Sequence, residues 1–144
     1  MSKAAFRTGS HVVFSIRLHI CFVTLYRRKV FTQPMLDRMP DILSRVLDPN
    51  NCILEQFNGE PDHVHLLVDL HPDTNISRLV GSMKSASSRI LRKEFSERID
   101  SFYWGPKAKL WHGSKCVVSC GGAPLDIVKQ YIENQAGGIA PKED

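Results

Sequence analysis

The fold is decided by residues 52–70, which read CILEQFNGEPDHVHLLVDL. Residues 52–57 and 63–70 are both short, mostly apolar runs, as is typical of β-strands. The five residues between them, 58–62, contain Asn-Gly and Pro-Asp, which are pairs that form turns. The stretch therefore predicts a β-hairpin with residues 58–62 as its connection.

Two histidines stand one residue apart in the second strand of this hairpin. Alternate side chains of a strand leave the same face, so His63 and His65 point to one side while Val64 packs on the other. Two imidazoles that converge in this way can hold a divalent metal and leave coordination positions open, as a catalytic site requires. Exposed strands also carry such pairs by chance, so the spacing alone leaves both interpretations open.

The residues before the hairpin predict one long strand and one helix. From Val12 to Val23 apolar residues alternate with a second set that includes Arg17, His19 and Cys21, which indicates a strand with one buried face. Apolar residues then recur at spacings of three and four across 35–47, as in an amphipathic helix.

The residues after the hairpin predict a second helix, a strand and a last helix. The helix covers 76–95, the strand 116–119, and the last helix about 123–136, before Gly137-Gly138. The polar face of the 76–95 helix is basic and carries Arg78, Lys84, Arg89, Arg92 and Lys93.

These elements follow one another in the order β-α-β-β-α-β-α. That order predicts an α+β fold of the split βαβ type, ferredoxin-like or RRM-like, with an antiparallel sheet, helices on one face and an added C-terminal helix. A chain of 144 residues has the size of one domain, so we assign residues 1–144 to a single unit.

The last helix carries a second candidate for chemistry. Tyr131 and Gln135 are four residues apart, so they share one helix face, with Asn134 beside them. A tyrosine with a pKa near ~10 is a poor nucleophile unless its setting is electropositive or a metal activates the electrophile. Taken by itself, the helix would equally allow Tyr131 to be an ordinary packing residue.

The composition limits the classes of protein to consider. The chain is 42% hydrophobic and 24% charged, with a formal net charge of +4, so we expect a folded protein that tolerates an anionic partner. Its four cysteines form no CxxC pair, which favours reduced thiols and a cytoplasmic location. We expect no signal peptide and no membrane span, because Arg17 and His19 interrupt the first apolar stretch.

Several motifs in order resemble those of the single-tyrosine HUH transposases of bacterial and archaeal insertion sequences. The resemblance covers nearly the whole chain and lies in five places: the strand beginning HVVF at His11, the basic turn YRRK at Tyr26, GEPDHVHLL at Gly59, Lys84 with Ser87-Ser88-Arg89, and LW at Leu110 followed by YIENQ at Tyr131. Such ordered motifs are far more specific than any one of them.

The resemblance implies a reaction and its residues. It implies that His63, His65 and Gln135 hold a magnesium or manganese ion, and that Tyr131 attacks a phosphodiester of single-stranded DNA to give a 5′-phosphotyrosine linkage and a free 3′-hydroxyl. It also implies recognition of hairpins at the ends of the element, without a nucleotide cofactor. The expected assembly is a homodimer in which each active site takes its tyrosine in trans from the other subunit.

The sequence departs from the family's pattern at one place. Lys115-Cys116 stands where the family usually has an aromatic pair, which puts a local DNA contact and possibly activity in question.

The sequence also leaves two rival functions open. They are a nucleic-acid-binding module without catalysis, and a metal-dependent phosphodiesterase that uses water as its nucleophile.

Basic side chains complete the candidate site. Five of them could contact DNA phosphates or could simply be solvated: Arg27, Arg28, Lys84, Arg89 and Arg92. Trp104 and Trp111 could stack on an unpaired base, but a place in the core or at its rim is the safer interpretation for both.

Overall fold

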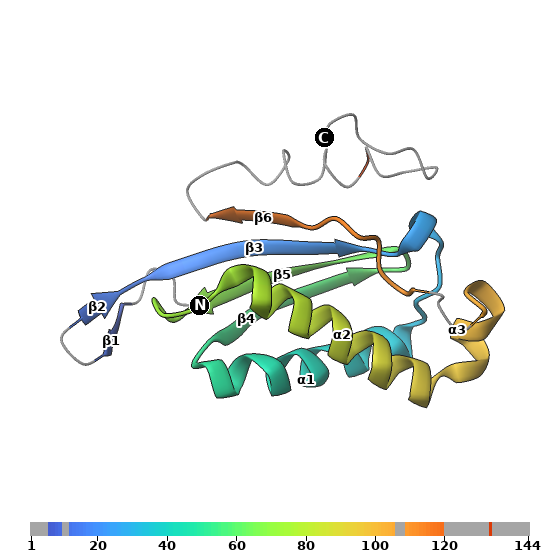
Figure 1. The fold of residues 1–144 in the computed structure, drawn as a ribbon, viewed down its shortest axis with the longest axis horizontal. Coiled ribbons are helices and arrows are strands. Elements are labelled where there is room, and N and C mark those ends of the chain that lie inside the picture. Colours follow the sequence, from blue (N-terminus) through green and yellow to red (C-terminus); the bar gives the residue numbers. More distant parts are fainter. Residues whose placement is uncertain (1–5, 10–11, 106–108, 120–132, 134–144) are drawn as a thin grey trace.

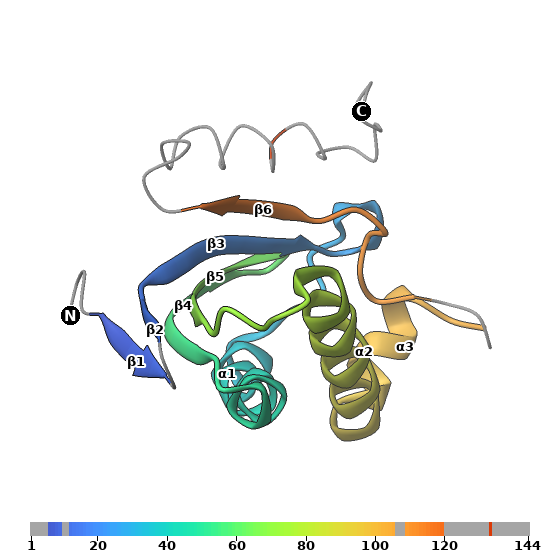
Figure 2. The same cartoon turned by 60° about the vertical axis from the view of Figure 1, so that its left-hand side comes forward.

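The protein is built on one antiparallel sheet with two long helices against one of its faces. The computed structural model describes residues 6–9, 12–105, 109–119 and 133. Figures 1 and 2 show helices α1 (Gln33–Leu47) and α2 (Ile76–Glu94) side by side below the sheet. The face of the sheet opposite these helices is called the histidine face below, because His63 and His65 lie on it.

The sheet has four strands, all paired antiparallel: β3 (Ile16–Val23), β4 (Ile53–Glu60), β5 (His63–Leu70) and β6 (Cys116–Ser119). Their order across the sheet is β4-β5-β3-β6, so β5 and β3 lie in the middle and β4 and β6 form the edges. This arrangement confirms the predicted α+β fold of the split βαβ type.

The N-terminal part of the first predicted strand forms a separate hairpin. The prediction of one unbroken strand from Val12 to Val23 was wrong, because β2 (Val12–Phe14) pairs with β1 (Arg7–Gly9) in a two-stranded sheet of its own. An ion pair ties this hairpin to the main sheet: Nη2 of Arg7 lies 3.0 Å from Oδ1 of Asp69. Asp69 is buried, so its carboxylate needs such a partner.

The connection between β4 and β5 is shorter than the sequence suggests. The expected five-residue link was wrong: Asn58, Gly59 and Glu60 continue β4 and pair with β5, which leaves only Pro61 and Asp62 as the turn. Gly59 is needed for packing rather than for turning. A Cβ placed on it would lie 2.5 Å from Cδ2 of Leu36, a buried side chain of α1.

Two glycine substitutions should therefore change stability in opposite directions. We expect Gly59→Ala to lower the free energy of unfolding by about 1–3 kcal/mol, because the added methyl group forces Leu36 or the strand to move. Gly81, in the middle of α2, has no atom within 4 Å of the equivalent position, so Gly81→Ala should raise stability by about 0.5–1 kcal/mol. Urea denaturation of both variants measures this, and equal effects would contradict the packing described here.

The second predicted helix ends earlier than expected and is followed by another. Phe95 has φ −127° and ψ 44°, which ends α2 at Glu94, and a short helix α3 (Ser96–Phe102) follows. At the start of α2, the side chain of Asn75 accepts a hydrogen bond from the backbone N–H of Arg78 at 3.0 Å, which caps the helix. Two short 3-10 turns, Leu25–Arg27 and Asp48–Asn50, flank α1.

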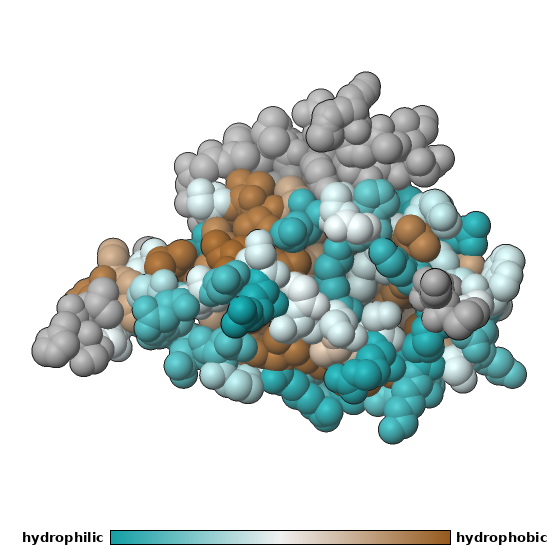
Figure 3. Space-filling view, viewed as in Figure 1, coloured by the Kyte–Doolittle hydropathy of each residue, from teal (hydrophilic) through white to brown (hydrophobic). Residues whose placement is uncertain are grey.

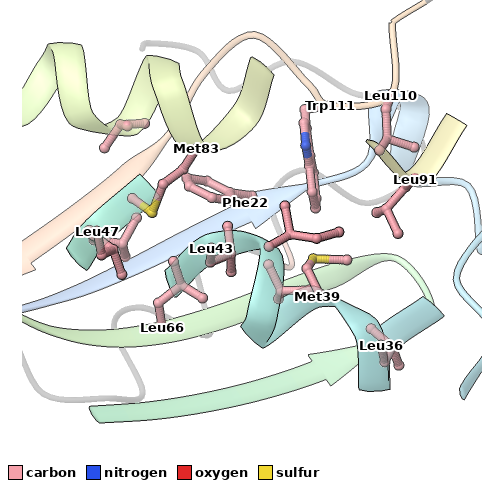
Figure 4. Packing of buried hydrophobic residues seen from close by; sticks show 14 of the residues in the cluster. Phe22, Leu36, Met39, Leu43, Leu47, Leu66, Met83, Leu91, Leu110 and Trp111 are labelled. Atoms are coloured by element: carbon pink, nitrogen blue, oxygen red, sulfur yellow. The ribbon is translucent and has the colours of Figure 1, made fainter. Parts of the chain in front are cut away.

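The core lies between the sheet and the two long helices. Trp111 belongs to this core (Figure 4). It packs edge to face on Phe22 with ring centroids 5.4 Å apart, and it is tilted against Phe31 at 5.3 Å. Its indole N–H donates to Oγ of Ser87, a buried hydroxyl, at 2.9 Å. Trp111 is thus a core residue, as the safer interpretation held.

The part of the histidine face that lies on β3 and β6, next to the histidines, is also buried. Cys21 was expected on the polar face of its strand, but it is only 1% exposed and forms a small apolar cluster with Val23 and Cys116. Cys21 and Cys116 are opposite each other on β3 and β6. Their hydrogen bond raises the pKa of the Cys21 thiol and lowers the pKa of the Cys116 thiol. The Cys116 that replaces an expected aromatic residue therefore still packs in the fold.

The surface shown in Figure 3 is mostly hydrophilic over the two long helices, and hydrophobic residues gather toward β1, β2 and β6. No helix in the described part of the chain is long and apolar enough to cross a membrane. The expected C-terminal helix at about 123–136, with Tyr131 and Gln135, lies outside the described residues except for Glu133.

Candidate active site on the histidine face

His63 and His65 line a pocket on the face of the sheet that α1 and α2 leave open. Their neighbours in β5, Val64 and Leu66, are buried in the core, so the alternation predicted from the sequence is present. The pocket has a volume of about 430 Å³. Most of its lining residues are polar and come from three strands, from the turn after β3 and from Glu133: His19, Arg27, Gln56, Asn58, Glu60, His63, His65 and Glu133, with Leu66 and Leu67. We call it the histidine pocket.

The strand register explains which polar groups meet there. Asn58 and Glu60 of β4 lie opposite His65 and His63, so the four side chains share one face. On the other side of β5, His19 of β3 lies opposite Leu67, one alternate position beyond His65. The hairpin thus brings together donors and acceptors that the sequence places in two separate strands.

Asp62 fixes the orientation of His63. Oδ1 of Asp62 lies 2.8 Å from Nδ1 of His63, while its other oxygen, Oδ2, accepts from Nε of Arg27 at 2.8 Å. Burial by itself would raise the pKa of the Asp62 carboxyl, but the bonds from His63 and Arg27 outweigh it and hold the pKa below its usual range. With Nδ1 bonded to this carboxylate, Nε2 is the nitrogen of His63 that remains for a ligand.

The two imidazoles suit a shared metal ion but do not complete a site for it. Their ring centroids are 5.2 Å apart at an interplanar angle of 80°. In the described residues no group of three or more His, Cys, Asp or Glu side chains is arranged to hold a metal ion. A histidine with its second nitrogen on a carboxylate is the usual form of a metal ligand, so the donor chemistry fits, and further ligands must be supplied by other groups.

Comparisons with known proteins agree with this geometry. The family described as transposase IS200 like matches residues 12–135, a span that includes every element of the main sheet and both histidines. The chain belongs to the IS200-like transposase family. Its members act as DNA transposases, and that class of activity applies to this chain as well.

Individual relatives support the assignment. The transposase resembles the ISDra2 transposase TnpA of Deinococcus radiodurans, with 26% identity over 129 residues that span 90% of each chain. It also resembles the transposase for insertion sequence element IS200 of Salmonella typhimurium, with 26% identity over 88 residues, which are 61% of this chain and 58% of that protein.

Two solved structures share its fold. A protein from Deinococcus radiodurans that is assigned as a transposase has a TM-score of 0.78 and 30% identity, with 93% of this chain and 99% of that chain covered. A REP-associated tyrosine transposase bound to a REP hairpin has a TM-score of 0.51 and 11% identity, with 92% and 69% covered, which shows a likeness of fold alone.

The basic residues of the transposase occupy three different places. Arg27 lines the histidine pocket, as described above. Arg28 lies on the other side of the same turn, where its Nη1 donates to the carbonyl of Phe102 at 2.6 Å. Arg89 is exposed on α2, and Arg92 of the same helix pairs with Asp100 at 3.1 Å, so both lie on the helix layer and away from the histidines.

Lys84 is not part of a solvated helix face. Its ammonium group donates to the carbonyls of His112 and Ser114, at 2.7 and 3.1 Å, and so holds residues 112–114 against α2. Burial first, and then the charges of Lys115 and Lys109, lower its pKa to about 8. The three lysines therefore concentrate positive charge around the segment that leads into β6.

The sequence did not identify Asp62 as part of the site of the transposase. It was taken as a turn residue, although its position directly before His63 was a signal, because a carboxylate next to a metal-binding histidine commonly orients the ring. Arg27 was predicted for DNA phosphates. The structure shows it bonded to Asp62, where, together with His63, it lowers the pKa of that carboxyl.

Proposed function

We propose that this transposase cuts and rejoins single-stranded DNA at the ends of its insertion sequence through a covalent bond to Tyr131, with a magnesium or manganese ion held at His63, His65 and Gln135. The observation that carries the proposal is the Asp62–His63 pair beside His65 in the histidine pocket. Glu133 lines the same pocket, and in the sequence it lies two residues from Tyr131 and two from Gln135.

The other tyrosines are poor candidates for the nucleophile. The chain has three, and Tyr103 is buried with its hydroxyl donating to the carbonyl of Leu25 at 2.6 Å. Tyr26 is exposed, but it lines a different pocket on the far side of its turn. This leaves Tyr131, which lies two residues from Glu133, a residue that lines the histidine pocket.

The chemistry follows from these groups. A divalent ion, when bound, supplies a Lewis acid for an oxygen of the scissile phosphate. The phenol oxygen of Tyr131 loses its proton and attacks phosphorus, the bond to the 3′-oxygen breaks, and that oxygen leaves as a hydroxyl. Asp62 keeps the proton of His63 on Nδ1, so that Nε2 presents its lone pair. Attack by another 3′-hydroxyl on the phosphotyrosine reverses the step and joins two ends.

The proposed substrate is a folded single strand with a hairpin. Family membership supplies DNA as the partner, and the structural neighbour bound to a REP hairpin supports a hairpin in particular. The net charge of +4 favours binding to a polyanion, and affinity should fall steeply with added salt because the release of DNA counterions into a more concentrated solution gains less entropy.

The test is incubation with an end-labelled single strand carrying such a hairpin and a divalent metal, followed by denaturing electrophoresis. The proposal expects a labelled protein band that is lost in Tyr131→Phe and in chelator. Cutting without a labelled protein would instead identify a phosphodiesterase that uses water. Binding without cutting would identify a binding module, and either result would overturn the proposal.

Asp62 offers a more selective test of the metal site. Removing a group that orients a metal ligand typically weakens metal binding by about 10–100-fold, and we expect this for Mn²⁺ binding to Asp62→Asn. Titration calorimetry measures it. Glu55→Gln is the matched control, because Glu55 also pairs with an arginine, Arg17, but does not line the pocket. A drop in melting temperature with unchanged Mn²⁺ affinity would make Asp62 merely structural.

We also propose that the active form is a homodimer with shared sites, as the family resemblance implies. Mixing Tyr131→Phe with His63→Ala under conditions that exchange subunits should then restore cleavage, because one site of the mixed dimer has both an intact tyrosine and intact histidines. Glu133 lines the pocket of its own chain, so the alternative is a site formed within one chain. In that case the mixture stays inactive although exchange is verified by mass spectrometry.

A further inference from the structure

The turn between β3 and α1 has an unusual backbone that divides its side chains between two sides. Tyr26 and Arg27 have φ angles of 58° and 53°, a left-handed conformation that costs on the order of 1 kcal/mol for each side-chain-bearing residue. Thr24 holds the turn in place: it is fully buried, its hydroxyl donates to the carbonyl of Arg28 at 2.7 Å, and its carbonyl accepts from the N–H of Arg27 at 2.8 Å.

As a result, residues that are adjacent in the sequence line different pockets. Arg27 reaches Asp62 in the histidine pocket, whereas Tyr26 and Arg28 line a second pocket of about 480 Å³. We call it the Tyr26–Trp104 pocket; its lining is Leu25, Tyr26, Arg28, Phe102, Tyr103, Trp104 and Lys109. One turn thus contributes residues to both pockets.

Two large aromatic rings are exposed in this second pocket. Trp104 is 71% exposed and Tyr26 is 58% exposed, whereas the other described tryptophan, Trp111, is 4% exposed. Aromatic side chains contribute most to stability when they are buried, so two exposed rings that line one hollow are better explained by a ligand than by folding. The flat faces of such rings suit a flat, unsaturated ligand.

The remaining polar groups of the pocket are cationic. The guanidinium of Arg28 lies 5.2 Å from the ring centroid of Tyr26 and 5.6 Å from that of Tyr103. Lys109 is exposed at the rim, and its charge is one of those that act on Lys84. Among the described residues that line the pocket there is no Asp or Glu, so the pocket favours an anion next to its aromatic surface.

We propose that the Tyr26–Trp104 pocket binds an unpaired base of the single DNA strand, which stacks on Trp104 and Tyr26 while Arg28 and Lys109 neutralise its phosphates. The inference rests on the proposed function in one respect: the strand is the one whose cleaved phosphate lies in the histidine pocket. Because one turn lines both pockets, a base bound here would fix the position of the strand relative to the histidines.

Tryptophan fluorescence tests this directly, because only Trp104 and Trp111 emit and only Trp104 is exposed. A short oligodeoxyadenylate should quench the emission of the wild-type protein, and a chain of abasic nucleotides of the same length should not. In Trp104→Phe the buried Trp111 remains, and the quenching should disappear. Quenching of equal size by the abasic chain would overturn the stacking proposal.

Affinity gives the second readout. Trp104→Ala removes the ring on which the base would stack. This variant should therefore bind the same oligonucleotide about tenfold or more weakly than the wild-type protein at constant salt. Phe6→Ala is the matched control, since Phe6 is 69% exposed but lies before β1 and outside the pocket. Equal affinities of the two variants would refute the proposal.

The two proposals can fail separately. If the wild-type protein forms the covalent DNA adduct while Trp104→Ala binds DNA as tightly as Phe6→Ala, only the pocket proposal is wrong. If stacking is observed but no adduct forms with any metal, the base pocket stands and the proposed cleavage reaction is wrong.

Discussion

His63→Ala should bind Mn²⁺ too weakly to measure and should cleave DNA at least about a thousandfold more slowly than the wild-type protein. A metal Lewis acid contributes several kcal/mol to such a reaction, and each 1.36 kcal/mol is about tenfold in rate. The fold should survive, because His63 lies on the histidine face and not in the core between sheet and helices. Single-turnover cleavage and calorimetry measure the two effects, and His65→Ala should behave alike.

The matched control is His71→Ala, which removes a histidine just after β5. His71 accepts a hydrogen bond from the N–H of Asp73 at 3.1 Å and does not line the histidine pocket. It should bind Mn²⁺ and cleave DNA as the wild-type protein does. Cleavage by His63→Ala at a rate near that of His71→Ala would show that the histidine pocket is not the site of the reaction.

The largest effect on stability is expected at Trp111. Replacing a buried tryptophan by alanine typically costs about 3–5 kcal/mol, and here it also takes the N–H partner from the buried hydroxyl of Ser87. Trp104→Ala is the internal comparison, because an exposed tryptophan should change the free energy of unfolding by only about 0.5 kcal/mol or less. Guanidinium denaturation of both variants measures this, and similar losses would contradict the burial described here.

Local patterns in the sequence were enough to predict most of the fold. Alternation at Val64 and Leu66 predicted which face of β5 is buried, and the spacing of apolar residues predicted α1 to within two residues. The errors arose where the role of a residue depends on a contact with a residue far away in the sequence. Gly59 was taken for a turn former because its contact with Leu36 of α1 depends on the tertiary structure.

In the candidate site, too, local patterns could be predicted and contacts between distant residues could not. The spacing of His63 and His65 predicted that both side chains leave one face of the strand, while their role as metal ligands came from the family resemblance. The bond of Asp62 to both His63 and Arg27 could not be predicted, since it requires the left-handed turn that brings Arg27 back to the hairpin. Lys84 was interpreted as one residue of a basic helix face. Only the structure shows that it donates to the carbonyls of His112 and Ser114, which are far from it in the sequence.

The account rests most heavily on Tyr131 as the residue that becomes attached to DNA. Peptide mapping by mass spectrometry of the covalent product would locate the attachment among the three tyrosines of the chain. The account predicts a 5′-phosphonucleotide on the peptide that contains Tyr131, formed only with a divalent metal and not in His63→Ala. A nucleotide on Tyr26 or Tyr103, or cleaved DNA without any modified peptide, would contradict it.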